Sequence, residues 1–276
     1  MVILRPTVLF RIFVWVLVAT HLGPSPGMAR EAPGVVAAKL QSFVELQLPP
    51  GDGPHPLVVL NPGCLGWHPH HQQWRAKLIK KGFAVVLVDS FAARGLTTRT
   101  QLENVCSGAS IPGSQRAGDL MAVLPNIWSR PDIQPDKTVM MGWSHGGWTA
   151  MDFLIMAANK ILPPNLSSMP PINVNNISAA FLFYPHCGFG SLSGEQGFPA
   201  SVVVRVYHGT ADRITSPSAC RARVDALASS GANIRFFPQR DAGHWFDNFA
   251  ERQTYNRSVA ARVESLIDQE LERLER

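Results

Sequence analysis

The stretch VMMGWSHGGWTA, residues 139–150, decides the fold of this chain. An apolar run ends at Ser144, with glycines two residues before and two residues after it. The spacing Gly142-x-Ser144-x-Gly146 is typical of a nucleophile elbow, a sharp strand-to-helix turn that holds a serine hydroxyl clear of the backbone. The glycines allow neighbouring backbone to approach where a Cβ would clash. Because so short a pattern also occurs in ordinary Gly-Ser turns, the rest of the chain must distinguish the two interpretations.

The length and composition are those of one globular domain. The chain has 276 residues, of which 46% are hydrophobic and 16% are charged, and it shows no internal repeat. The formal charge of +5 is not concentrated in a basic cluster of the kind that binds nucleic acid. We therefore expect a single domain over residues 30–276 and no nucleic-acid partner.

The first 29 residues resemble a signal peptide. Arg5 and Arg11 precede or open an apolar run at 12–22, and the small residues of Gly-Met-Ala at 27–29 suit cleavage. The apolar run is shorter than the ~20 residues of a membrane span, although an uncleaved anchor is the alternative. Loss of the two arginines lowers the formal charge from +5 to +3. We predict export to the periplasm or the medium, without stable membrane insertion after cleavage.

Short apolar runs alternate with amphipathic segments after a loose N-terminal stretch at 30–41. This alternation indicates a mostly parallel sheet with helices on both faces, in which chemistry gathers at the C-terminal ends of the strands. The predicted strands are 42–48, 56–63, 83–90, 138–143, 177–185, 201–209 and 233–238, and the predicted helices are 70–82, 114–128, 145–159, 215–230 and 247–275.

Three residues that follow predicted strands form a possible catalytic set. Ser144, Asp212 and His244 occur in the chain order expected for an α/β-hydrolase. His244 would take the proton of Ser144 and return it to the leaving group, while Asp212 would orient and stabilise the imidazolium. Singly each residue is weak support, since an aspartate after a strand is usually a turn residue. Together they predict a Ser-His-Asp triad.

A serine nucleophile also needs N–H donors for the oxyanion that develops on the substrate. The backbone N–H of His145, directly after the nucleophile, is the first candidate. We expect the second donor in the loop NPGCLG at 61–66, from Cys64 or, failing that, from Leu65.

These motifs together resemble the dienelactone hydrolase family of α/β-hydrolases. The resemblance covers roughly residues 55–250 and implies a sheet of eight strands or slightly fewer, no cofactor, and hydrolysis of esters or lactones. NPGCLG is similar to the HGCGG of exported members. The other motifs that carry the resemblance are SFAARG at 90–95, GWSHGG at 142–147, HGTAD at 208–212 and AGHWFD at 242–247.

The chain departs from the family pattern at its nucleophile. Dienelactone hydrolases proper carry cysteine there, whereas this chain has Ser144, which favours a general carboxylic-ester hydrolase. The family's arginine near the substrate carboxylate is matched only loosely, by Arg94, and a surface ion pair would explain that residue equally well. The aromatic residues near the predicted site would line an acyl or aryl pocket, with core packing as the alternative for some: Trp67, Trp143, Trp148 and Trp245.

A histidine cluster lies beside the predicted oxyanion loop. His68, His70 and His71 are close enough in sequence to suggest a transition-metal site. No carboxylate or cysteine completes the ligand set, and a serine triad needs no metal. We therefore predict no metal site.

The four cysteines contain no CxxC pair, so a zinc or redox motif is not expected. An even number in an exported chain predicts two disulfides. The cysteines that follow neighbouring predicted strands suggest the pairs Cys64–Cys106 and Cys187–Cys220, with the other pairings and free thiols as alternatives.

The segment 161–176 is rich in proline and asparagine and has no periodicity. We expect a mobile flap over the mouth of the site, with a plain surface loop as the alternative.

The leading functional interpretation is an exported serine hydrolase that cleaves a small ester or lactone through an acyl-enzyme, as a monomer or small homo-oligomer. A peptidase or amidase would use the same triad. A non-catalytic binding protein on a hydrolase fold belongs to a different class, because fold alone does not determine function.

Overall fold

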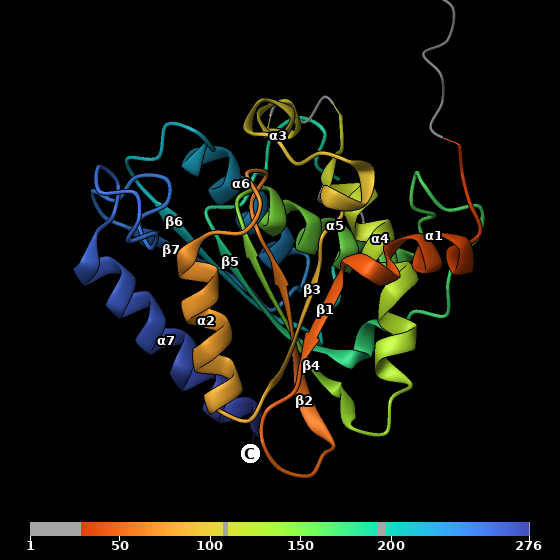
Figure 1. Ribbon diagram of the computed structural model, residues 1–276. Coiled ribbons are helices and arrows are strands. Elements are labelled where there is room, and N and C mark those ends of the chain that lie inside the picture. Colours follow the sequence, from red (N-terminus) through yellow and green to blue (C-terminus); the bar gives the residue numbers. More distant parts are fainter. Residues whose placement is uncertain (1–28, 107–109, 193–196, 276) are drawn as a thin grey trace, which may run out of the picture.

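The computed structural model describes residues 29–106, 110–192 and 197–275 of the chain (Figure 1). Its centre is a seven-stranded sheet with the strand order β1-β3-β2-β4-β5-β6-β7. β1 pairs with β3 in the antiparallel sense, and every other neighbouring pair is parallel. The predicted α/β class and the mostly parallel sheet are confirmed. The predicted signal segment lies outside the described residues, except for Ala29.

The strands of the structure agree closely with the predicted runs, apart from β4, which starts five residues earlier than the apolar run 138–143. Two helices, α1 and α3, were not predicted. The strands are β1 (Val44–Gln47), β2 (His55–Asn61), β3 (Ala84–Val88), β4 (Ile133–Trp143), β5 (Ile177–Phe183), β6 (Val203–Gly209) and β7 (Ile234–Gln239). The helices are α1 (Pro33–Leu40), α2 (Pro69–Lys80), α3 (Arg99–Cys106), α4 (Gly113–Trp128), α5 (His145–Asn159), α6 (Pro217–Ser229) and α7 (Arg257–Glu275).

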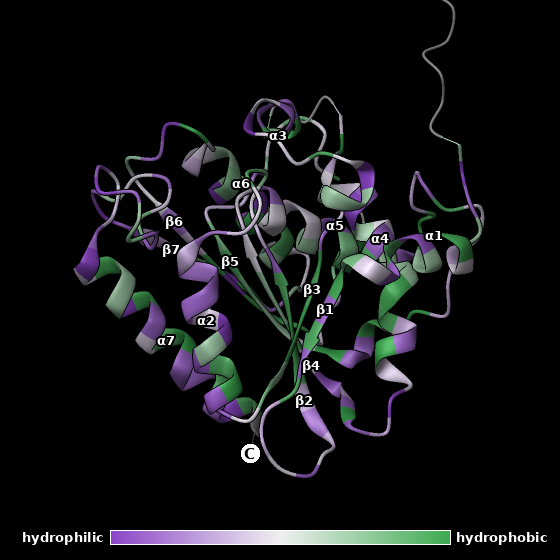
Figure 2. Cartoon of the chain, viewed as in Figure 1, coloured by the Kyte–Doolittle hydropathy of each residue, from purple (hydrophilic) through white to green (hydrophobic). Residues whose placement is uncertain are grey.

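Helices cover both faces of the sheet because its central strands are apolar on both sides. In β2, Leu57 and Val59 pack in the core formed with α1, α4, α5 and α6. Val58 and Leu60 point the other way, into the core formed with α2 and α7. Figure 1 shows these two helix layers on opposite sides of the strands. Figure 2 shows the strands mainly green and the outward turns of α2 and α7 purple, as this burial requires.

No helix among the described residues is long and apolar enough to cross a bilayer.

The segment 161–176 does not form a flap over the candidate site, so that prediction is wrong. α5 begins at the C-terminal edge of the sheet and carries the chain away from it, and β5 is entered from the opposite edge. The segment instead packs beside α4 and the N-terminal stretch. Asn165 is buried and donates to Asp119 at 2.9 Å, and Leu166 forms a bridge with Glu31.

Candidate active site

The turn between β4 and α5 has the geometry of a nucleophile elbow. Ser144 adopts φ 52° and ψ −113°, a strained conformation for a residue with a side chain. The flanking glycines are required by close backbone contacts. A Cβ on Gly142 would lie 2.5 Å from the carbonyl oxygen of Gly146, and one on Gly146 would lie 1.8 Å from that of Asn61. The tightness of this turn explains the sequence pattern.

A cavity of about 620 Å³ lies at the C-terminal edge of the sheet, beside the elbow. Parallel strands deliver their C-terminal residues to one edge, so loops that are far apart in sequence share its wall. The predicted site residues that line it are Cys64, Leu65, Trp143, Ser144, His145, His244 and Trp245.

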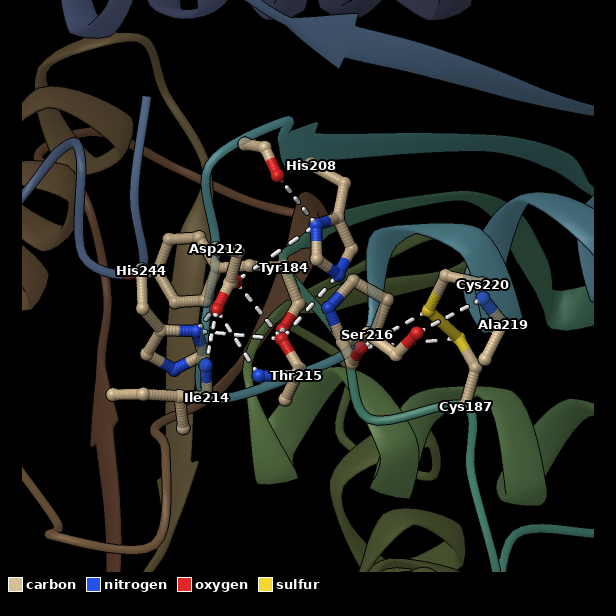
Figure 3. Close-up of polar contacts among 12 residues, drawn as sticks. Tyr184, Cys187, His208, Asp212, Ile214, Thr215, Ser216, Ala219, Cys220 and His244 are labelled. Atoms are coloured by element: carbon tan, nitrogen blue, oxygen red, sulfur yellow. Dashed lines mark hydrogen bonds and ion pairs between the residues drawn. A yellow bond between two sulfur atoms is a disulfide. The ribbon is translucent and has the colours of Figure 1, made fainter. Parts of the chain in front are cut away.

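Asp212 is held in an array of hydrogen bonds at the end of β6. One carboxylate oxygen bonds to Nδ1 of His244 at 2.8 Å and accepts from the Thr215 hydroxyl at 2.9 Å. The other oxygen accepts the backbone N–H groups of Ile214, at 2.8 Å, and Thr215, at 3.0 Å. Figure 3 shows Asp212 between His244 and Thr215.

The environment of Asp212 keeps its carboxyl group ionised. Burial on its own raises the pKa, but the hydrogen bond and charge of His244 and the two backbone N–H donors outweigh it. The net pKa of Asp212 is below its ordinary value. An ionised carboxylate at Nδ1 orients the His244 imidazole, whose other nitrogen remains for proton transfer.

Ser144 and His244 both line the cavity, but the structure has no hydrogen bond between their side chains. The Ser144 hydroxyl has no side-chain partner among the described residues, which leaves it open to the cavity. Contacts between nucleophile and base are often long without substrate and tighten in the complex. The ring of Tyr184 packs against the imidazole of His244, with 4.4 Å between centroids, and restricts its movement.

The proposed oxyanion donors are available for a ligand. The backbone N–H groups of His145, Cys64 and Leu65 have no acceptor among the described residues. The loop turns tightly next to them, since the N–H of Gly66 bonds to the carbonyl of Gly63 at 3.0 Å. Unpaired N–H groups at a cavity wall are what an oxyanion requires.

Arg116 connects the loop that carries Cys64 and Leu65 to His145. Its Nη1 donates to the carbonyl of Pro62 at 3.0 Å and to Nδ1 of His145 at 3.1 Å. Nε2 of His145 donates in turn to the carbonyl of Ile111 at 2.8 Å. This arrangement needs a neutral imidazole with its proton on Nε2. Burial, followed by the charge of Arg116, lowers the pKa of His145 to about 3.

The sequence did not indicate this role for Arg116. The residue lies on the predicted helix 114–128, where nothing in the pattern separates it from a surface arginine. In the structure its side chain is buried, and burial lowers its pKa to about 10, so it remains a cation at neutral pH. Its guanidinium lies 4.6 Å from the ring centroid of Phe91.

Asp247 ties the His244 loop to the central strands. It accepts a hydrogen bond from the indole N–H of Trp143 and one from the hydroxyl of Tyr184, both at 2.7 Å. Trp143 directly precedes the nucleophile, and Tyr184 is the residue that packs on His244. Burial and the charge of Asp247 raise the pKa of Tyr184 well above its ordinary value, so the phenol stays a donor. The motif AGHWFD contained this residue, but not its partners.

Two predicted substrate-binding residues do not line the cavity. Arg94 donates both terminal nitrogens to the carboxylate of Asp119, at 2.8 and 2.9 Å, and lines a separate, smaller cavity. Because Asp119 is fully buried, it needs this cation as a partner. Trp67 packs on the ring of His71 at 5.4 Å, with Arg75 over its face. The structure thus corrects both assignments, whereas Trp148, also expected near the site, lines the cavity.

Both predicted disulfides are present. The bonds Cys64–Cys106 and Cys187–Cys220 each have a Cα–Cα distance of 5.0 Å, within the usual range. No free cysteine occurs in the described part of the chain. Cys64 and Cys106 line the cavity, whereas Cys187 and Cys220 do not. The first bridge therefore anchors the loop that carries the candidate oxyanion donors to α3.

The histidine cluster caps a helix. Nδ1 of His71 accepts the backbone N–H of His68 at 2.9 Å, which closes a capping box at the start of α2. The rings of His70 and His71 are in close contact, with 3.8 Å between centroids and a tilt of 40° between their planes. Among the described residues there is no group of three histidine, cysteine or acidic side chains arranged to hold a metal ion.

No protein-family model matches the chain, and no curated protein is similar to it in sequence. Its fold is nevertheless shared with solved structures. A dienelactone hydrolase-like promiscuous phosphotriesterase from metagenomic libraries is 18% identical with a TM-score of 0.65, over 84% of this chain and 92% of its own. A putative dienelactone hydrolase from Klebsiella pneumoniae is 15% identical with a TM-score of 0.60, over 81% and 96%.

A third similar structure is a thermophilic esterase from Thermogutta terrifontis, solved with propionate bound. It is 17% identical with a TM-score of 0.57, over 90% of this chain and 95% of its own. The same enzyme, esterase 2, has also been solved phosphorylated by paraoxon. At these identities the comparisons establish the α/β-hydrolase fold of dienelactone hydrolase-like proteins and esterases.

Proposed function

We propose that this protein is a serine hydrolase of carboxylic esters, with Ser144 as nucleophile, His244 as general base and Asp212 as the residue that orients it. One observation carries the proposal. A strained serine opens into the same cavity as a histidine whose Nδ1 is bound to a buried carboxylate at 2.8 Å. No purely structural requirement accounts for a strained, unpaired hydroxyl at a cavity wall.

The chemistry follows from the positions of these groups. His244 removes the proton of Ser144 as its oxygen attacks the ester carbonyl, and the carbonyl oxygen becomes an anion that accepts the N–H groups of His145 and Cys64. Collapse of this intermediate breaks the bond to the alcohol, which takes the proton from His244. Water then attacks the acyl-enzyme with the same proton transfers in reverse, releasing the acid and free Ser144.

The structural neighbours favour esters over amides as the substrate class. One of them, esterase 2 of Thermogutta terrifontis, was solved both with propionate bound and phosphorylated by paraoxon. A peptidase or amidase would use the same residues, and no feature of this cavity favours it. The two disulfides support export to an oxidising compartment.

Covalent labelling tests the proposal directly. Wild-type protein treated with a fluorophosphonate should gain one label on Ser144, and Ser144→Ala should gain none. Ser90→Ala is the matched control, because Ser90 is buried like Ser144 but lies outside the cavity. Absence of label on the wild type would overturn the proposal. Turnover of p-nitrophenyl esters, lactones and peptides then ranks the substrate classes.

A further inference from the structure

The candidate cavity has an unusual charge balance for a site that resembles dienelactone hydrolases. Among the described residues no lysine or arginine lines it, and Glu103 is its only acidic side chain. Arg94 pairs with Asp119. Arg116 does not line the cavity, and its Nη1 donates to the carbonyl of Pro62 and to His145. A carboxylate on the substrate would therefore lose water without gaining a cation, and would lie near Glu103.

Six histidines line the cavity among the described residues, and four of them do not supply this missing charge. Of the other two, His186 bonds to the carbonyl of Phe189 and His244 bonds to Asp212. Burial lowers the pKa of His68, His70 and His71 below the ordinary histidine value. His145 is neutral and bonded at both ring nitrogens. Three tryptophans, Trp143, Trp148 and Trp245, contribute aromatic surface to the wall.

Two large apolar side chains stand in solvent at the same cavity. Phe189 is 102% exposed and Ile214 is 63% exposed, and both line the cavity. Only five large apolar residues of the described chain are more than about a third exposed, so two at one site form a patch rather than scattered residues. An exposed phenylalanine gains about 1.5–3 kcal/mol if a ligand removes it fully from water.

The backbone at both positions is anchored. The N–H of Ile214 donates to Asp212 at 2.8 Å, so this residue is held by the same carboxylate that orients His244. The carbonyl of Phe189 bonds to Nε2 of His186 at 3.0 Å, and the Cys187–Cys220 bridge fixes the chain two residues earlier. The backbone that carries these two side chains is therefore anchored beside the cavity.

We infer that the cavity takes neutral esters with a large apolar or aromatic group, which packs on Phe189 and Ile214, and that it discriminates against esters with a carboxylate on that group. This inference rests on the proposed ester hydrolysis at Ser144. The inferred preference differs from that of a hydrolase that acts on lactones with a carboxylate group.

A pair of substrates tests the charge discrimination. p-Nitrophenyl hexanoate and mono-p-nitrophenyl adipate differ in that a carboxylate replaces the terminal methyl group. We expect kcat/KM for the hexanoate to be roughly 10- to 100-fold higher, as expected for burying an unpaired polar group at a cost of about 1–3 kcal/mol. Equal values, or a preference for the adipate, would overturn the inference.

Variants at the mouth test the apolar contact. Phe189→Ala and Ile214→Ala should each lower the ratio of kcat/KM for p-nitrophenyl octanoate to kcat/KM for p-nitrophenyl acetate about 3- to 10-fold. Val35→Ala is the matched control, because Val35 is 47% exposed on α1 and does not line the cavity. Parallel losses with acetate and octanoate, or no loss with either, would contradict the assigned contact.

The rate of inactivation by paraoxon separates this inference from the proposed function. If paraoxon does not phosphorylate the wild-type protein, the proposed function itself is contradicted. If wild type and variants are all phosphorylated, but the enzyme does not discriminate by chain length or charge, only the inference about substrate class is contradicted.

Discussion

Removing the Cys64–Cys106 bridge tests whether the oxyanion wall depends on its anchor to α3. The variant Cys64→Ala/Cys106→Ala keeps the backbone N–H of residue 64 and deletes only the cross-link. The second bridge supplies a control, Cys187→Ala/Cys220→Ala, with a loop of similar length and no residue at the cavity wall.

The two loops give nearly equal expected losses of stability. The bridges join residues separated by 42 and 33 positions. The chain-entropy relation converts these separations into about 4 and about 3.7 kcal/mol at 25 °C. Both variants should therefore lose similar free energy of unfolding in urea titrations followed by tryptophan fluorescence.

The effects on catalysis should differ. Without its anchor, the loop at Cys64 positions an oxyanion donor less well, and loss of one such donor costs about 10²- to 10³-fold in kcat. We expect the Cys64/Cys106 variant to lose at least about tenfold in kcat with p-nitrophenyl acetate, and the control to stay within about twofold.

The concentration of active sites is determined by titration with paraoxon, and kcat is calculated per active site. The measurements are made well below the melting temperatures of both variants. Equal losses of kcat in the two variants would refute the reasoning, because they would reflect stability alone. An unchanged free energy of unfolding in both would refute the loop-entropy argument.

Three further changes have distinct expected outcomes. Ser144→Ala combined with His244→Ala should lower kcat scarcely more than either change alone, because the two residues act as a unit, and multiplied losses would contradict the triad. Gly146→Ala should prevent folding of the elbow, since its Cβ would lie 1.8 Å from a carbonyl oxygen, whereas Gly34→Ala in α1 meets no atom within 4 Å and should stabilise by about 0.5–1 kcal/mol in thermal unfolding. Asp152 is fully buried, and burial raises its pKa from 3.8 to about 7. The stability that depends on its protonated form is complete below the unfolded-state pKa and is lost as the pH rises through about 7, so wild type should lose about 3 kcal/mol between pH 5 and pH 8. Asp152→Asn should remove that dependence in urea titrations, and an unchanged pH profile in the variant would show that another group is responsible.

Local patterns in the sequence were enough to predict the architecture. Strands that are buried on both faces read as apolar runs, and the helices between them carry helical periodicity, so the α/β class followed from spacing alone. The elbow could be recognised in the sequence because its close backbone contacts leave no room for a Cβ two residues before and two residues after Ser144. The disulfide pairs followed from the strand ends that the topology brings together.

Short elements were harder to predict. α1 is only eight residues long and forms because Val36, Ala37 and Leu40 pack against α4, a partner distant in sequence. Its helical preference is therefore decided by tertiary packing.

The partners of buried polar side chains were decided only by the tertiary structure. Arg94 and Arg116 are both arginines near the site, yet one pairs with Asp119 outside the cavity. The other donates to both Pro62, 54 residues before it in the chain, and His145, 29 residues after it. The direction of a long side chain depends on which buried acceptor lies within its reach, and that acceptor is delivered by another element. Periodicity reports which face of a helix is apolar, but carries no information about such a partner.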